Sequence, residues 1–131
     1  MNGVPSCANG KLQNGLVRGE WGWDGFIVSD CGAIGDVQSP HHYTHTNEDT
    51  VAATLKGGCD LECDSMYSKY LLPALNMSKI TEADLDTAVS RTLTGFIELG
   101  ELDPPEEVPF VYNSVHLRRL CSARIYIVSK S

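Results

Sequence analysis

Residues 18–30 read RGEWGWDGFIVSD and contain the clearest strand signal in the chain. Glycines at positions 19, 22 and 25 predict a turn, and the apolar run Phe26–Val28 follows it directly. A short apolar run between a glycine-rich turn and the polar pair Ser29 and Asp30 is typical of a buried parallel strand. The sequence therefore predicts a strand whose carboxyl end points at Asp30.

Helical signals lie on both sides of this strand. Residues 11–21 carry apolar side chains at helical spacing without a proline, which predicts a short amphipathic helix. A second helix is predicted from about residue 47, because Thr46 or Asn47 suits the N-cap and acidic residues fill the first turn. Gly57 and Gly58 predict the end of that helix.

A second short strand is predicted over Cys59–Cys63. The helical segment after it is expected to be interrupted at Pro73. Residues 82–99 form a stronger helix, with Thr81 as its cap and Asp84 three residues further on. This alternation predicts a parallel α/β fold. Because two strands alone would leave their outer edges unpaired, it also predicts that the chain is part of a larger sheet.

The chain changes character near its end. Residues 103–107 read DPPEE and predict a linker. Beyond the linker, residues 112–131 carry basic side chains in an otherwise acidic chain. We therefore expect one partial domain over residues 1–103, and a linker with a divergent, poorly ordered tail over residues 104–131.

Composition argues against several classes of function. The 131 residues are 42% hydrophobic and 21% charged, which is typical of a globular soluble protein. A net charge of −7 without an extended basic patch argues against a nucleic-acid partner. No apolar run approaches the roughly 20 residues needed to cross a bilayer, so no membrane partner is expected. The polar start MNGVP does not read as a signal peptide.

Metal binding is not expected. Cys59 and Cys63 are four residues apart, but no second pair and no suitably spaced histidine completes a zinc site. The three histidines within residues 41–45 are better explained as part of a solvated loop. The sequence therefore predicts neither a metal nor an organic cofactor.

Three segments together resemble glycoside hydrolase family 3, and the resemblance covers most of residues 1–103. Residues 1–7, MNGVPSC, resemble the end of a segment typical of the family. Residues 18–30 resemble its R-x-x-W-G-F-x-G-x-I-V-S-D segment, which ends in the catalytic nucleophile. Residues 58–63, GCDLEC, are similar to the G-x-D-x-x-C segment of xylosidase-like members. The cysteine directly after Asp30 also favours xylosidase-like over glucosidase-like members.

The resemblance implies an α/β fold, namely the carboxyl-terminal portion of a (β/α)8 TIM barrel. Phe26–Asp30 would be its seventh strand and Cys59–Cys63 its eighth. The earlier strands, which carry several sugar-binding residues, would lie outside this chain. So would a second domain, which commonly supplies the general acid/base. An isolated chain is therefore expected to be inactive.

The implied function is that of a fragment of a retaining β-glycosidase. Its parent would hydrolyse terminal β-linked xylose or arabinose from an oligosaccharide or glycoside. A β-glucosidase-like member is one alternative, and a non-catalytic sugar-binding or vestigial fragment is another. The parent is expected to be secreted or extracellular.

The resemblance also assigns roles to individual residues. Asp30 corresponds to the nucleophile, although from its position alone it would be read as an Asp that caps a turn. Glu62 and Cys31 are candidates for contact with the substrate. Cys31 and Cys63 would lie just past neighbouring strand ends, where a disulfide and a pair of buried thiols are both open.

Overall fold

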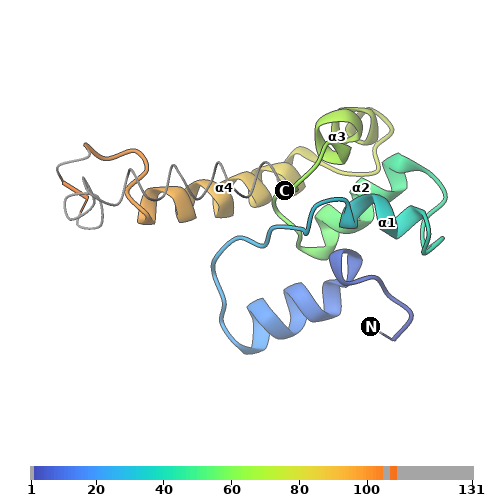
Figure 1. Cartoon of the computed structure of the whole chain (residues 1–131), viewed down its shortest axis with the longest axis horizontal. Helices are drawn as coiled ribbons and strands as arrows, with labels where there is room; N and C mark the ends of the chain where they lie inside the picture. The colour runs from blue at the N-terminus through green and yellow to red at the C-terminus, as the bar shows by residue number, and fades with distance from the viewer. Residues whose placement is uncertain (1, 105–106, 109–131) are drawn as a thin grey trace, which may run out of the picture. The chain divides into compact units, whose positions relative to one another are not determined.

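The computed structural model describes residues 2–104 and 107–108 (Figure 1). The chain divides into two compact units, residues 1–95 and residues 96–131, and the site described below lies in the first unit. The predicted tail over residues 112–131 lies outside the described residues. In chain order, the helices are the 3₁₀-helix η1 (Ser6–Ala8), the π-helix η2 (Lys11–Glu20), α1 (Ala33–Gln38), α2 (Asn47–Gly57), α3 (Met66–Asn76) and α4 (Glu82–Glu98).

The two predicted strands are the main correction to the sequence-based fold. Within residues 2–104 and 107–108 the structure contains no strand, only one isolated parallel bridge between Val28 and Leu61. Around it, the amide of Ser29 donates to the carbonyl of Leu61 at 2.9 Å, and the amide of Asp60 donates to the carbonyl of Ile27 at 2.8 Å. The two segments are thus parallel neighbours, but among the described residues neither has the second strand neighbour that a buried parallel strand requires. The described part of the chain is therefore mostly helical rather than α/β.

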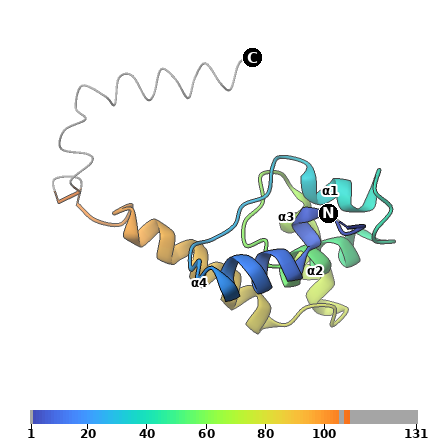
Figure 2. The ribbon, with the colours of Figure 1, turned by 90° about the horizontal axis from the view of Figure 1, so that it is seen from below.

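The apolar core of the first unit lies where α2 meets α3. Figure 2 shows α1, α2 and α3 grouped together, and α2 packs against both of the other helices. Thr50 and Thr54, on α2, are also fully buried. Their hydroxyls donate to carbonyls one turn earlier in the helix, so these buried polar groups have hydrogen-bond partners. The buried residues of this core are Val51, Ala52, Leu55, Ala74, Ile80 and Ala88.

Local capping signals were predicted correctly from the sequence. The Thr46 hydroxyl accepts from the amide of Asp49 at 3.1 Å and begins α2, and Gly58, with φ of 105°, ends it. At the start of α4, the amide of Thr81 donates to the Asp84 carboxylate at 2.8 Å, and the amide of Asp84 donates to the Thr81 hydroxyl at 3.2 Å. This reciprocal pair is a capping box.

Two helical details differ from the sequence prediction. Pro73 does not interrupt the segment after Cys63, because α3 runs through it, and the next residue, Ala74, is fully buried in the core. The packing of α3 in the core therefore outweighs the lost backbone hydrogen bond. The short helix α1 was not predicted. It follows Gly32, which has a φ of 83°, and it buries Ile34 and Val37. No described helix is long and apolar enough to cross a membrane.

The capping box at α4 makes stability depend on pH. The hydrogen bond from the Thr81 amide holds the pKa of the Asp84 carboxyl below its ordinary value. A lowered folded-state pKa means that the carboxylate stabilises the fold above the unfolded-state pKa, about 3.9. This stabilisation is lost as the pH falls through the folded-state pKa.

We therefore expect Asp84→Asn to lower the urea midpoint of the chain at neutral pH, and to leave it nearly unchanged at a pH below the folded-state pKa of Asp84, where that carboxyl is itself protonated. Circular dichroism during urea unfolding measures both midpoints. The control is Asp86→Asn, which changes an exposed residue of the same helix and should have little effect at either pH. An equal loss at both pH values for Asp84→Asn would contradict the capping role.

Candidate active site

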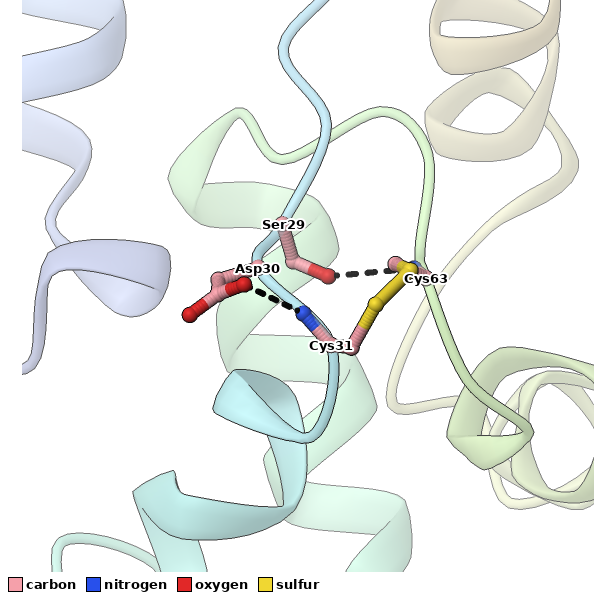
Figure 3. The surroundings of a disulfide bond; sticks show 4 residues. All are labelled: Ser29, Asp30, Cys31 and Cys63. Atoms are coloured by element: carbon pink, nitrogen blue, oxygen red, sulfur yellow. Dashed lines mark hydrogen bonds between the residues drawn. A yellow bond between two sulfur atoms is a disulfide. The ribbon is translucent and has the colours of Figure 1, made fainter. Parts of the chain in front are cut away.

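The backbone on both sides of the parallel bridge places Asp30. Ser29 is buried, and its hydroxyl accepts from the amide of Cys63 at 3.3 Å. Its own amide is bound to the carbonyl of Leu61. Figure 3 shows the Ser29 hydroxyl directed at Cys63, while the Asp30 side chain leaves the backbone on the opposite side. The alternation typical of an extended segment therefore buries Ser29 and exposes Asp30.

A disulfide joins the two loops that follow the bridge. Cys31 and Cys63 are bonded, with their Cα atoms 4.5 Å apart (Figure 3). The sequence left a disulfide and two free thiols open, and the structure contains the disulfide. Because Cys31 directly follows Asp30, the bond fixes the backbone next to that carboxylate.

The carboxylate of Asp30 is exposed and held by its neighbour. Its Oδ1 accepts from the amide of Cys31 at 2.9 Å. The backbone carbonyl of Asp30 accepts from the amide of Ala33 at 3.2 Å, at the start of α1. An exposed carboxylate on a backbone fixed by a disulfide is suited to attack an electrophilic carbon or to stabilise a developing positive charge.

Glu62 has a structural task in the described chain. One of its carboxylate oxygens accepts from the amide of Met66 at 2.9 Å, and the other accepts from the amide of Tyr67 at 2.6 Å. These amides belong to the first turn of α3, where the helix dipole favours a negative charge. The geometry thus makes Glu62 an N-terminal cap of α3, and contact of Glu62 or Cys31 with a substrate stays a prediction.

A buried ion-pair cluster forms around Asp60. The side chain of Asp60 is 2% exposed, and its carboxylate contacts Arg18 at 2.5 Å and Arg91 at 3.1 Å. It also accepts from the amide of Ile27 at 2.8 Å. The partners are 42 and 31 residues from Asp60 in the chain, and spacing in a single sequence does not reveal them.

This cluster connects the two segments that carry the site. Arg18 also donates to the carbonyl of Gly58 at 3.1 Å, so it binds the segment before Asp60 as well as Asp60 itself. Burial lowers the pKa of the Arg18 guanidinium, and the nearby Asp60 carboxylate opposes that shift. The ion pairs therefore hold the chain before Asp30 against the chain before Cys63.

A pocket of about 420 Å³ lies beside η1 and α1, within the size range of small-molecule sites. Asp36, His41 and Tyr43 supply its polar and aromatic side chains. Asp30 does not line this pocket. Cys7 does line it, and the negative charge of Asp30 acts to raise the pKa of the Cys7 thiol. The full lining is Gly3, Val4, Pro5, Ser6, Cys7, Ala33, Asp36, His41 and Tyr43. Among the described residues, no group of three or more His, Cys, Asp or Glu side chains could hold a metal ion.

Comparison with known proteins gives a consistent result. The family model described as the glycosyl hydrolase family 3 N-terminal domain matches residues 1–94. A protein named probable exo-1,4-beta-xylosidase from Aspergillus clavatus is 39% identical over 113 residues, which are 84% of this chain and 15% of that protein. The chain thus spans about one seventh of the length of this curated relative.

Solved structures agree with the sequence comparison. A family 3 exo-beta-xylosidase in complex with a xylobiose aziridine activity-based probe matches 84% of this chain and 14% of its own, with a TM-score of 0.77 and 31% identity. A beta-glucosidase from Listeria innocua matches 79% of this chain and 14% of its own, with a TM-score of 0.74 and 30% identity. The matched residues include the segment before Asp30, the ion-pair cluster and the disulfide, and the chain belongs to glycosyl hydrolase family 3.

Proposed function

We propose that this chain forms the carboxyl-terminal part of the catalytic barrel of a retaining β-glycosidase, in which Asp30 is the nucleophile. The parent enzyme would hydrolyse terminal β-linked xylose or arabinose. The observation that carries the proposal is the exposed Asp30 carboxylate, which lies two residues after Val28 of the parallel bridge and directly precedes a disulfide-bonded cysteine. In a TIM barrel, chemistry is located where the parallel strands end at their carboxyl side.

The proposed reaction needs two carboxyl groups. Asp30 would attack the anomeric carbon and form a covalent glycosyl ester while the leaving oxygen takes a proton from the general acid. The same second group would then activate water to break the ester, so that the anomeric configuration is retained. In this proposal the second carboxyl comes from a part of the parent enzyme outside this chain.

Exposed apolar side chains support a larger parent fold. Val28, in the parallel bridge, is 51% exposed, and Trp21 and Trp23 are 70% and 51% exposed. In a complete barrel, the open side of Val28 would face a neighbouring strand, and large apolar side chains would gain cover. The missing barrel half and a second domain are thus the partners that this proposal requires.

The disulfide supports a secreted or extracellular parent. Bonds such as Cys31–Cys63 form and persist in oxidising compartments and are rare in the reducing cytosol. The proposal therefore includes a parent enzyme that is secreted or extracellular.

A hybrid enzyme tests the proposed function. Residues 1–94 would replace the matching segment of the Aspergillus clavatus relative, whose remaining length would supply the rest of the proposed enzyme. We expect the purified hybrid to release nitrophenol from an aryl β-D-xyloside. A folded hybrid with native-like circular dichroism but no activity would contradict the proposal.

The isolated chain should not be a catalyst. We expect its rate on an aryl β-D-xyloside to equal that of its Asp30→Ala variant, because attack without an acid/base and without the missing sugar ligands is ineffective. Release of nitrophenol measures both rates. Turnover by the isolated chain that Asp30→Ala abolishes would show that the site is complete in itself.

The similarity to the Listeria innocua structure, described as a beta-glucosidase, keeps a glucosidase-like parent as a second candidate. A non-catalytic sugar-binding or vestigial product is a third. Isothermal titration of the chain with xylose and with glucose separates these readings. Binding of xylose without turnover favours the sugar-binding product. Faster release of nitrophenol by the hybrid enzyme from an aryl β-D-glucoside than from an aryl β-D-xyloside favours the glucosidase-like parent.

A further inference from the structure

Two further cysteines meet next to the candidate site. Cys7 lies in η1 and Cys59 follows α2, and both carry free thiols. The two thiols lie close enough for each to shift the pKa of the other. The pair is separate from the Cys31–Cys63 disulfide, and no step of the proposed glycosidase reaction uses it.

Backbone packing fixes this contact. A Cβ added at Gly57 would come within 3.0 Å of the carbonyl oxygen of Cys7 and within 2.9 Å of the carbonyl carbon of Ala8. Only a glycine at position 57 therefore lets η1 approach the end of α2 this closely. Two residues later, Cys59 is 1% exposed, and its Sγ lies 3.5 Å from the carbonyl oxygen of Leu61.

The two thiols differ in a way that suits thiol–disulfide exchange. Cys7 is half-buried and lines the pocket beside η1 and α1, so a small molecule in that pocket can reach it. The interaction with the Cys59 side chain lowers the pKa of Cys7 to about 7, whereas the pKa of Cys59 is raised by its interaction with Cys7 and by burial. A thiol with a pKa near the ambient pH is the best attacking group in exchange.

We propose that Cys7 and Cys59 form a second disulfide by exchange with a low-molecular-weight disulfide such as oxidised glutathione. The Cys7 thiolate attacks one glutathione sulfur, which forms a mixed disulfide and releases one glutathione thiolate. Cys59 then loses its proton to water, and its thiolate attacks the Cys7 sulfur and releases the second glutathione thiolate. Two protein thiols are oxidised and one oxidised glutathione is reduced to two thiols, with the released protons in balance.

The bond would tie η1 to the segment that carries the ion-pair cluster. Asp60 directly follows Cys59, and Cys7 forms part of the pocket wall. The new disulfide would therefore cross-link the pocket wall to the backbone that leads to Cys63. This inference concerns the fold alone and does not depend on which sugar the parent enzyme uses.

Peptide mapping tests the proposal on the full chain with Cys121→Ser, a change that removes the fifth cysteine. The chain is equilibrated with reduced and oxidised glutathione, blocked with N-ethylmaleimide and digested with trypsin and a glutamate-specific protease. Cleavage after Lys56 and Glu62 separates Cys59 from Cys63, so the two disulfides appear as different linked peptides. We expect a peptide of residues 1–11 linked to residues 57–62, beside residues 21–48 linked to 63–69.

The single variants add a directional readout. Cys59→Ser should accumulate a glutathione adduct on Cys7, because the second thiol is missing, whereas Cys7→Ser should leave buried Cys59 without an adduct. The Cys31–Cys63 peptide should persist in both variants and reports that the loops have folded. The proposal would be overturned if the Cys31–Cys63 disulfide forms but Cys7 and Cys59 both carry maleimide. Failure of both disulfides to form would overturn it as well.

Discussion

Asp30→Asn in the hybrid enzyme is expected to lower kcat/KM for an aryl β-D-xyloside by at least about 10⁴-fold. Losses of this order or larger follow when a catalytic nucleophile is removed from a complete site. Asparagine has nearly the same shape and can still accept a hydrogen bond from the Cys31 amide, but its amide oxygen is a poor nucleophile. Steady-state kinetics with the purified variant measures the effect.

The neighbouring carboxylate supplies the matched control. Asp36→Asn changes an exposed residue of α1 that lies six positions further along the chain and lines the adjacent pocket. It should retain activity within about tenfold, because one lost polar contact to a ligand corresponds to about 1.4 kcal/mol or less. An Asp30→Asn hybrid that keeps activity comparable to the Asp36→Asn hybrid would remove Asp30 from the reaction.

Asp60→Ala is expected to lower the free energy of unfolding of the chain by about 3–5 kcal/mol, the range for breaking a buried ion pair by removal of one partner. The change leaves the guanidinium of Arg18, whose side chain is 9% exposed, without its carboxylate. It also removes the acceptor of the Ile27 amide, and a buried donor left unpaired adds to the loss. Urea unfolding followed by circular dichroism measures the difference.

Asp86→Ala is the control for this stability effect. It removes an equal charge from an exposed position on α4, where substitutions usually change stability by no more than about 0.5 kcal/mol. If Asp60→Ala were as mild as Asp86→Ala, the Arg18–Asp60–Arg91 cluster would not be what holds the two site segments together.

Local signals were sufficient for part of the fold. The Thr46 cap, the end of α2 at Gly58 and the capping box at Thr81 each depend on residues a few positions apart, and sequence spacing alone reveals them. The position of Asp30 after an apolar run was also visible. For α1, a signal existed in the spacing of Ile34 and Val37, both buried, but the helix is only six residues long.

The remaining features depend on contacts distant in the sequence. Whether Phe26–Val28 forms a strand is decided by the strands beside it, and the bridge within the described residues pairs Val28 with Leu61. Similarly, Arg18 and Asp60 are 42 residues apart, and no periodic pattern relates them. The two uses of cysteine, bonded at Cys31 and free at Cys59, follow from three-dimensional proximity rather than from spacing.

Covalent trapping in the hybrid enzyme tests the central claim most directly. The hybrid is incubated with a xylose-configured aziridine that esterifies the nucleophile of a retaining glycosidase, then digested and analysed by tandem mass spectrometry. We predict one sugar adduct, carried by Asp30 in the peptide of residues 21–48 and absent from the Asp30→Asn variant. An active hybrid whose adduct lies on a different carboxylate would contradict the account.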